Sequence, residues 1–326
     1  MTRPREDKPV VILAGPTASG KTRVAMALAR RLPIEIISID SALVYVGMDI
    51  GTAKPDSSMR QSVPHHLIDI MDPTQNYSAA RFAEDAWRIA REVLSRDRLP
   101  VLVGGTMLYI KAFREGLAVL PPADLETRRT IDALATKLGW PSMHARLHSL
   151  DPAAAARLDP NDAQRIQRAL EICHVTGKPM SSLLSGGRIA PPRIQVNVIS
   201  IEPSDRAILH RRISTRFEEM LEQGLVDEVR RLRERYRLSP DLPSMRCVGY
   251  RQTWQYLEGE FGLGRLRETA LGATRQLAKR QLTWLRAMHD VERYDCLRED
   301  IEEVVCDKVL QDLTGNRPGI SGGNSY

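Results

Sequence analysis

The octapeptide GPTASGKT at residues 15–22 matches the pattern G-x-x-x-x-G-K-[ST] at every position. It follows an apolar run at residues 9–14 and precedes TRVAMALARRL, a segment with helical periodicity. A glycine-rich turn between a buried strand and a helix directs backbone N–H groups at phosphate oxygens, where the helix dipole favours anions. The sequence therefore predicts a phosphate-binding loop made of Gly15, Pro16, Thr17, Ala18, Ser19, Gly20, Lys21 and Thr22. Lys21 is expected to contact the terminal phosphate, and the Thr22 hydroxyl to ligate Mg²⁺.

Strand-like and helix-like segments alternate along the first hundred residues. Apolar runs at residues 9–14, 34–39, 66–70 and 100–105 are predicted to be buried strands. Residues 78–98 have amphipathic helical periodicity, with Ser78 as the expected N-cap. This alternation predicts an α/β fold, a P-loop NTPase-like three-layer domain with a mainly parallel sheet.

The alternation of strand-like and helix-like segments ends after Gly116. Residues 117–190 are helix-prone and are predicted to form a helical insertion domain, after which the apolar run at 194–203 returns to the sheet. The chain is mostly helical from 205 onward, and residues 313–326 are expected to be a disordered tail. The expected core therefore comprises residues 1–116 and 191–312.

Composition excludes several classes of protein. No apolar run approaches the ~18 residues of a membrane span, and the N-terminus resembles neither a signal nor a transit peptide. The four cysteines are too scattered for a disulfide framework or a zinc site, which is typical of reduced thiols in a cytoplasmic protein. The net charge of +6 is only a weak indication of a polyanionic partner.

An acid follows the second predicted strand rather than the fourth. Hydrolytic P-loop enzymes carry an Asp at the end of an apolar strand near the loop, but here the run VLVGG ends at Thr106 without an acid. Asp40 instead lies at the carboxyl edge of the sheet, facing the phosphate loop. It could serve as a metal ligand, as a base, or merely as a helix N-cap.

Longer motifs resemble the tRNA dimethylallyltransferases, also called tRNA isopentenylpyrophosphate transferases. The motifs are GPTASGKT (15–22), DSALVYVGMDIGTAKP (40–55), VPHHLID (63–69), VLVGGTMLYIKA (101–112), NDAQRIQRALE (161–171), LPSMRCVGYRQTW (242–254) and TRQLAKRQLTWLR (274–286). They span nearly the whole chain in the family's order. The chain departs from the family at Val46, where a basic residue is usual, and one polar contact beside Asp40 is expected to weaken. The C-terminal zinc finger of larger eukaryotic relatives is missing, so the resemblance is to the bacterial type.

The resemblance implies transfer of a dimethylallyl group from dimethylallyl diphosphate to N6 of the adenosine immediately 3′ of the anticodon in tRNA. Asp40 resembles the family's base for the attacking amine, and Thr106 resembles its hydroxyl that contacts the amine or the diphosphate. Lys21, the loop amides and Mg²⁺ would stabilise the departing diphosphate. A monomer that binds one tRNA is also implied.

An adenine in a stacked loop must be extruded to reach a buried diphosphate, so other groups have to grip the RNA. Lys279, Thr283 and Arg286 share one face at helical spacing, and Tyr250 offers a stacking ring. The resemblance implies tRNA contacts at Asp40, Ser41, Ala42, Leu43, Thr106, Arg128, Gln164, Arg165, Ile166, Gln167, Arg168, Arg246, Cys247, Val248, Gly249, Tyr250, Arg251, Lys279, Arg280, Gln281, Leu282, Thr283, Trp284, Leu285 and Arg286. Arg216 is a further candidate for a substrate or phosphate contact.

The placement of charge supports an RNA partner better than the total does. Residues 205–237 contain nine arginines and seven acids, which nearly cancel. Residues 246–286 contain eight basic and three acidic residues, a net charge of +5. This segment is where the resemblance places much of the tRNA contact.

Two alternatives stay open at this point. A related prenyltransferase uses free AMP, ADP or ATP, but the insertion and the basic C-terminal segments would then have no task. A small-molecule kinase would consume ATP without RNA, and binding of ATP at the same loop is not excluded. A purely RNA-binding module is disfavoured by the intact phosphate-loop motif.

Overall fold

The computed structural model describes residues 9–192 and 194–314, which form two compact units. One unit contains the residues up to Arg114 together with those from Pro192 onward, and the other is Glu115–Pro191. These boundaries fall within two residues of the predicted insertion at 117–190. No helix in the described part of the chain is long and apolar enough to cross a membrane.

The first unit is built on a six-stranded sheet with the order β3-β2-β4-β1-β7-β8 and parallel pairing throughout. The strands are β1 (Val10–Ala14), β2 (Ile34–Ile39), β3 (His65–His66), β4 (Leu99–Gly104), β7 (Val196–Glu202) and β8 (Val291–Asp295). Gly104 at the end of β4 pairs with both Ala14 and Ile39. The ends of β1, β2 and β4 therefore meet at one edge, where ligands of parallel sheets bind.

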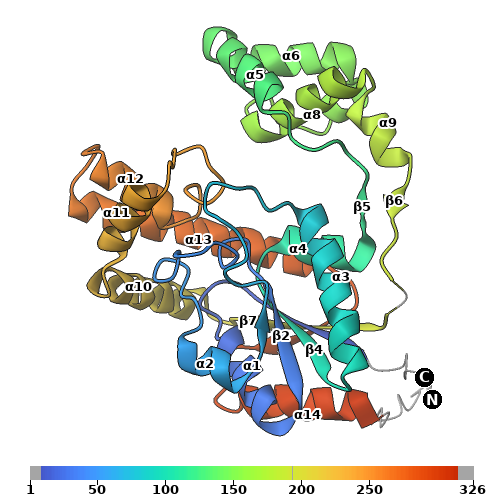
Figure 1. The fold of residues 1–326 in the computed structure, drawn as a ribbon, viewed down its shortest axis with the longest axis vertical. Helices are drawn as coiled ribbons and strands as arrows, with labels where there is room; N and C mark the ends of the chain where they lie inside the picture. Colours follow the sequence, from blue (N-terminus) through green and yellow to red (C-terminus); the bar gives the residue numbers. More distant parts are fainter. Residues whose placement is uncertain (1–8, 193, 315–326) are drawn as a thin grey trace, which may run out of the picture. The chain divides into compact units, whose positions relative to one another are not determined.

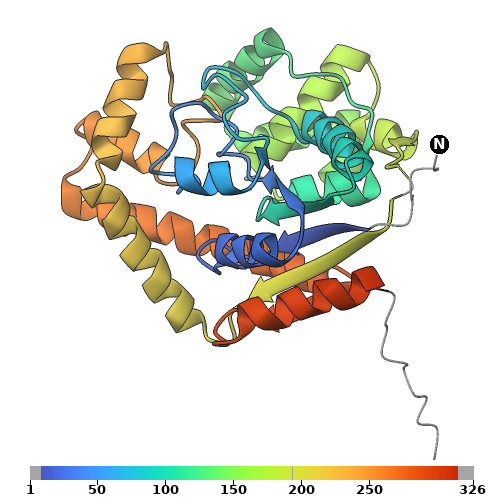
Figure 2. The ribbon, with the colours of Figure 1, turned by 60° about the horizontal axis from the view of Figure 1, so that its bottom comes forward.

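Helices cover both faces of this sheet (Figures 1 and 2). On one face, α1 (Lys21–Arg31) and α14 (Ile301–Thr314) pack on alternate strand residues such as Leu13 and Ile36. On the other face, α3 (Ala79–Ser95) packs on β2 and β4, and α4 (Met107–Glu115) is bonded to α3 through Trp87 Nε1 and the Phe113 carbonyl oxygen. The predicted three-layer α/β class is confirmed.

Further helices of this unit lie between β7 and β8. They are α10 (Arg206–Glu222), α11 (Leu225–Arg235), α12 (Tyr250–Leu257) and the long α13 (Leu263–Ala287). Leu209 and Ile213 of α10 pack on Ala278 of α13, with Ala18 of the phosphate loop against the same cluster. The short α2 (Ser57–Ser62) begins at Asp56, whose carboxylate accepts the Met59 N–H.

The second unit is helical, with α5 (Leu125–Leu138), α6 (Trp140–Leu150), α7 (Pro152–Ala155), α8 (Ala163–Thr176) and α9 (Met180–Ser185). Ile131, Leu147 and Ile166 lie in its own core. The antiparallel pair β5 (Leu117–Ala118) and β6 (Arg188–Ile189) lies at the two ends of this unit and was not predicted from the sequence.

Three predictions about the elements are corrected by the structure. The strand predicted at 66–70 is only His65–His66, because Leu67 and Asp69 have positive φ angles of 61° and 55° that interrupt an extended chain. The strand β8 lies within the region predicted to be mostly helical. Residues 313 and 314 belong to α14 rather than to a disordered tail, whose remaining residues, 315–326, lie outside the described residues.

Candidate active site

The phosphate loop connects β1 to α1, as the motif predicts. Gly20 has φ 86°, a left-handed conformation that favours glycine, and it precedes the first residue of α1. At Gly15 a Cβ atom would lie 2.5 Å from the Ile201 carbonyl oxygen and 2.7 Å from Ser19 Oγ. Glycine is therefore favoured at position 20 by the backbone conformation and required at position 15 by the close approach of neighbouring atoms.

Lys21 folds back over this loop. Its ammonium donates a 2.6 Å hydrogen bond to the Pro16 carbonyl oxygen. Burial, and secondarily the positive charge of Arg216, lower the pKa of Lys21 to about 8, while Asp40 opposes the shift. Lys21, Arg216 and Asp40 are therefore near enough to influence one another's charge.

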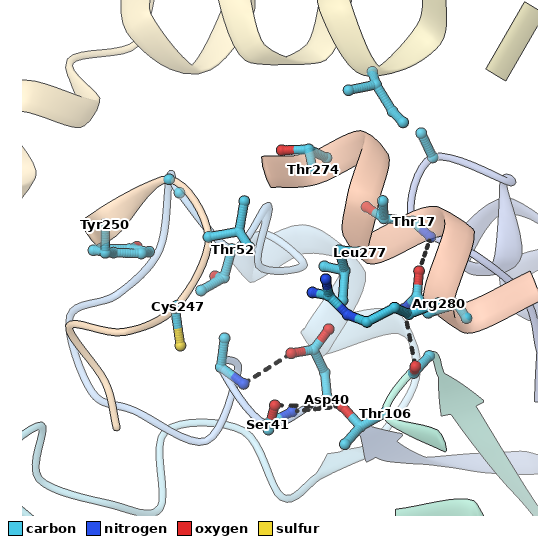
Figure 3. A pocket seen from close by; sticks show the side chains of 18 of the residues that line it. Thr17, Asp40, Ser41, Thr52, Thr106, Cys247, Tyr250, Thr274, Leu277 and Arg280 are labelled. Carbon is cyan, nitrogen blue, oxygen red and sulfur yellow. Dashed lines mark hydrogen bonds between the residues drawn. The ribbon is translucent and has the colours of Figure 1, made fainter. Parts of the chain in front are cut away.

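Asp40 and Thr106 lie at the ends of the neighbouring strands β2 and β4. The Asp40 carboxylate accepts a 2.8 Å hydrogen bond from the Ala42 N–H, and the Thr106 hydroxyl accepts a 3.1 Å bond from the Ser41 N–H. The Thr106 N–H in turn donates to the Ile39 carbonyl oxygen. The pairing of β2 with β4 thus brings together two predicted catalytic groups that are 66 positions apart (Figure 3).

A first cavity of about 510 Å³ opens over these two residues. Its polar lining includes Thr17, Asp40, Thr106 and Arg280 (Figure 3). Its apolar lining comes from α4, α10 and α13 and from the segment after α11, with Met107, Leu108, Ile213, Phe217, Met220, Val248, Leu277 and Trp284. A flat heterocycle and a short apolar chain both fit a site of this chemistry.

A second cavity of about 1230 Å³ adjoins the helix end of the phosphate loop, where it is lined by Lys21 and Thr22. Cationic side chains dominate its polar lining, namely Lys21, Arg23, Arg30, Lys54, Arg60, Arg211, Arg212 and Arg216, against Asp49, Asp56 and Glu219. This excess of positive charge suits a polyphosphate. Ala18, Arg216 and Met220 line both cavities, so the two spaces adjoin at these residues.

Arg216, predicted as a further substrate contact, is the charged residue common to both cavities. Its guanidinium donates a 3.5 Å hydrogen bond to the Thr52 carbonyl oxygen. Burial lowers the pKa of this guanidinium, and the nearby Asp40 partly offsets the effect.

Gln281, predicted to contact tRNA, is buried and bonded to the main chain of two loops. Its Oε1 accepts a 2.9 Å bond from the Thr17 N–H, and its Nε2 donates a 2.9 Å bond to the Gly105 carbonyl oxygen. Each end of the amide makes one hydrogen bond, so the side chain holds the two loops together; Gln281 also lines the first cavity, and its contact with RNA stays a prediction. The sequence holds no local signal for these bonds.

Of the other residues at 279–286, some side chains are exposed and others are buried. Lys279, Arg280, Thr283, Trp284 and Arg286 are exposed, as expected for groups that contact a large ligand. Leu282 and Leu285 are 5% and 0% exposed, so they present almost no surface for their predicted direct contacts with RNA. They pack α13 into the core instead.

The segment at 246–251 also divides. Arg246 and Arg251 are exposed, and Arg246, Cys247, Val248 and Gly249 line the first cavity. Burial raises the pKa of the Cys247 thiol to about 12. Tyr250 is buried, its hydroxyl donates to Glu228 Oε1, and the residue also lines the first cavity; its stacking on a base stays a prediction.

Three other predicted tRNA contacts lie before α2. Ser41 is exposed and Ala42 is half-buried, and both line the first cavity. Leu43 is half-buried and its carbonyl oxygen accepts the Asp69 N–H. Val46 is also half-buried, and its N–H donates to the Met71 carbonyl oxygen.

In the helical unit, four predicted RNA contacts are bonded to acidic side chains of the same unit. Arg128 and Arg168 both bond to Glu171, which is completely buried. Arg165 pairs with Asp162 and the Gln167 amide bonds to Asp132, while Gln164 is exposed. Ile166 is 0% exposed in this unit's core, so it presents no surface for its predicted contact with RNA.

The donors around the loop suit a metal ion that arrives with a phosphorylated ligand. No group of three or more His, Cys, Asp or Glu residues that could hold a metal occurs among the described residues. Thr22 is exposed at the second cavity, and the buried Ser19 hydroxyl lacks a partner within the described part of the chain. Mg²⁺ is commonly held by one or two protein groups together with phosphate oxygens and water, which these hydroxyls fit.

Comparison with known proteins identifies relatives along nearly the whole chain. The family model described as IPP transferase matches residues 43–288. A tRNA dimethylallyltransferase of Nitrosomonas europaea is 55% identical over 93% of this chain and 96% of its own, and one of Bordetella parapertussis is 58% identical over 89% and 94%. A crystal structure of the tRNA isopentenylpyrophosphate transferase of Bacillus halodurans aligns with TM-score 0.67 and 36% identity, over 95% of this chain and 99% of its own. A eukaryotic dimethylallyltransferase acting on tRNA aligns with TM-score 0.76 and 25% identity, over 97% of this chain and 82% of its own.

Proposed function

This chain belongs to the IPP transferase family, and we propose that it transfers a dimethylallyl group from dimethylallyl diphosphate to N6 of the adenosine immediately 3′ of the anticodon in tRNA. The relatives quoted above are named tRNA dimethylallyltransferases, and the match covers nearly the whole length of each. The structural observation that supports the proposal is the meeting of two chemically different cavities at Ala18, Arg216 and Met220.

The two substrates are assigned by the chemistry of these cavities. The cationic second cavity, with Lys21 and Thr22, takes the diphosphate. The first cavity, with Asp40 and Thr106, takes the extruded adenine together with the apolar allyl group. In this assignment Arg216 faces the bond that breaks, between the allylic carbon and the diphosphate oxygen.

The reaction forms one bond and breaks another. The N6 nitrogen attacks the allylic carbon, the carbon–oxygen bond breaks, and the diphosphate leaves with the electron pair. The exocyclic amine becomes more acidic as its bond to carbon forms, and Asp40 takes the proton that N6 releases. Lys21, Arg216 and the loop amides stabilise the negative charge on the departing diphosphate. Mg²⁺, held by Thr22 and diphosphate oxygens, would add positive charge at the same group.

A tRNA substrate accounts for exposed basic and aromatic side chains that a free nucleotide would not contact. Arg280 and Trp284 line the mouth of the adenine cavity and are exposed, and Lys279 and Arg286 continue the same helix. Such cations neutralise phosphates, and an exposed indole stacks on bases. Because a single chain lines both cavities, we propose that a monomer is sufficient and that it acts in the cytoplasm, where tRNA is modified.

A substrate-comparison assay tests the proposal. Purified protein is incubated with radiolabelled dimethylallyl diphosphate and Mg²⁺, together with unmodified tRNA, with AMP, or with ATP alone. We expect label in tRNA, at the nucleoside beside the anticodon, and none in AMP. Labelling of AMP at a higher rate would favour an adenylate isopentenyltransferase, and release of ADP without RNA would favour a kinase.

A further inference from the structure

Glu228 of α11 is a buried carboxylate, 4% exposed, that is bonded to a distant loop. It accepts hydrogen bonds from three successive backbone N–H groups, those of Asp49 at 3.0 Å, Ile50 at 2.7 Å and Gly51 at 3.2 Å. A fourth bond, of 2.5 Å, comes from the Tyr250 hydroxyl. A buried charge is costly unless it is fully bonded, and these four hydrogen bonds compensate the buried carboxylate.

The loop held in this way borders both cavities. Asp49 and Ile50 line the diphosphate cavity, and Gly51 and Thr52 line the adenine cavity. The Thr52 carbonyl oxygen is the acceptor of the bond from Arg216. A continuous path of hydrogen bonds and covalent chain therefore leads from Glu228 through residues 49–52 to the guanidinium shared by the two cavities.

A buried cation fixes the far end of the same loop. Lys54, whose side chain is 3% exposed, pairs with Asp49 at 2.7 Å and with Asp69, and it donates a 2.9 Å bond to the Tyr45 carbonyl oxygen. The Thr52 hydroxyl adds a 2.7 Å bond to the Met48 carbonyl oxygen. With anchors on both sides, the Thr52 carbonyl has little freedom to move.

Close packing reinforces the anchor at Glu228. A Cβ atom at Gly51 would lie 2.6 Å from the Tyr250 ring and 2.8 Å from Leu225 Cδ1. The backbone of the loop thus rests directly on α11 and α12, and a glycine is needed for this approach.

We propose that Glu228 is a positioning residue for prenyl transfer, which fixes the loop at residues 49–52 and through the Thr52 carbonyl places Arg216 between the two substrates. The inference rests on the proposed function. Glu228 is not among the described residues that line either cavity, so it acts through the loop and not by touching a substrate.

The test is a double-mutant cycle in which the binding of inorganic pyrophosphate is measured by calorimetry. Glu228→Gln keeps the size of the side chain but replaces one acceptor oxygen by a donor, which faces either the Gly51 N–H and the Tyr250 hydroxyl or the N–H groups of Asp49 and Ile50. We expect it to weaken binding about tenfold in the otherwise unaltered protein and less than twofold in the Arg216→Met background. An equal loss in both backgrounds would show that Glu228 does not act through Arg216, and would overturn the inference.

Two further variants separate positioning from folding. Glu234→Gln, an exposed glutamate on the same helix, is the matched control and should leave binding unchanged. If Glu228→Gln does not fold, the cycle is repeated with Tyr250→Phe, which removes only one of the four bonds. There we expect a loss of about twofold to threefold that disappears in the Arg216→Met background, and an undiminished loss would overturn the inference.

The same samples distinguish this inference from the proposed function. If the wild-type protein fails to label tRNA, the function is wrong whatever the pyrophosphate cycle shows. If the wild type labels tRNA but Glu228→Gln matches Glu234→Gln in kcat and in KM for dimethylallyl diphosphate, only the positioning role is wrong. We expect kcat to fall about tenfold or more, with the Kd for tRNA unchanged.

Discussion

The side-chain oxygen of Gln281 accepts a 2.9 Å hydrogen bond from the backbone N–H of Thr17, although 264 positions separate the two residues. The other end of the same amide donates to the Gly105 carbonyl oxygen, immediately before Thr106. One side chain of α13 therefore sets the spacing between the phosphate loop and the strand end that carries Thr106. Because Lys279, Arg280 and Trp284 are exposed on the same helix, RNA bound there would lie close to this contact.

Replacing Gln281 should damage catalysis more than RNA binding. Gln281→Met keeps the volume but leaves the Thr17 N–H and the Gly105 carbonyl oxygen without partners, at a cost of about 1–3 kcal/mol for each group. We expect kcat/KM for dimethylallyl diphosphate to fall at least tenfold and Tm to drop by several degrees, with a nearly unchanged Kd for tRNA. Gln276→Met, at an exposed position of α13, is the control. A loss confined to tRNA affinity would support the RNA contact predicted from the sequence.

Asp40 and Thr106 should differ in their effects. Asp40→Asn keeps an oxygen that can accept the Ala42 N–H but removes the basic carboxylate, so single-turnover transfer should fall about 10²–10⁴-fold. Thr106→Val removes the acceptor of the Ser41 N–H and should slow transfer by a smaller factor. Both rates are measured with saturating tRNA, and calorimetry with pyrophosphate checks that the phosphate loop is intact. Near wild-type transfer by Asp40→Asn would exclude this residue as the base.

The fold was predictable from sequence where local pattern and packing agree. The apolar runs of β1, β2, β4 and β7 are buried on both faces and bounded by turn residues, so the sequence alone identifies them. β8, with the sequence VERYD, lies at the edge of the sheet and none of its residues is fully buried, so it lacks that pattern. The prediction of a strand at 66–70 was wrong for another reason: Leu67 and Asp69 have positive φ, and the N–H groups of residues 69–71 bond to the carbonyl oxygens of residues 43 and 44, which are distant in the sequence.

The site was predictable only where a residue belongs to a motif that has a local mechanism. The phosphate loop and Asp40 follow from the strand ends that precede them. Glu228 and Gln281 make their contacts across 177 and 264 positions, and nothing local in the sequence distinguishes them from surface residues of a helix. Tyr250 and Ile166 were predicted to contact RNA because they belong to motifs, and the sequence does not show that both are buried.

The exposed cations of α13 should account for part of the salt dependence of tRNA binding. Each phosphate that a side chain neutralises contributes about 0.7 to the slope of log K against log salt concentration on a single strand. We expect Lys279→Ala and Arg286→Ala each to reduce the slope by about that amount. Arg265→Ala is the control, because Arg265 on the same helix pairs with Glu268. Equal slopes for all of these proteins would move the RNA contact away from this part of α13.

Lys21 should carry a stability cost that its function explains. Its pKa is about 8 in the folded protein against an ordinary value of 10.5, since burial disfavours the charge. Below pH 8 both states hold the proton and the penalty is complete; between pH 8 and 10.5 only the unfolded state binds it, so stability rises with pH in that window. We expect Lys21→Met to stabilise the protein by about 1–2 kcal/mol at pH 7 and to lose this advantage by pH 10.5, as measured by denaturant unfolding.

The same shift should make diphosphate binding depend on pH. As pH rises through about 8, the free protein loses the Lys21 charge, and the Kd for pyrophosphate should increase about tenfold for each pH unit above the pKa. Lys21→Arg stays charged throughout this range because the guanidinium pKa lies far higher, so its affinity should change little between pH 7 and 9.5. Parallel pH profiles for the wild type and Lys21→Arg would mean that a different group controls the affinity. A steep profile in the wild type alone would identify the buried ammonium as the charge that holds the leaving group.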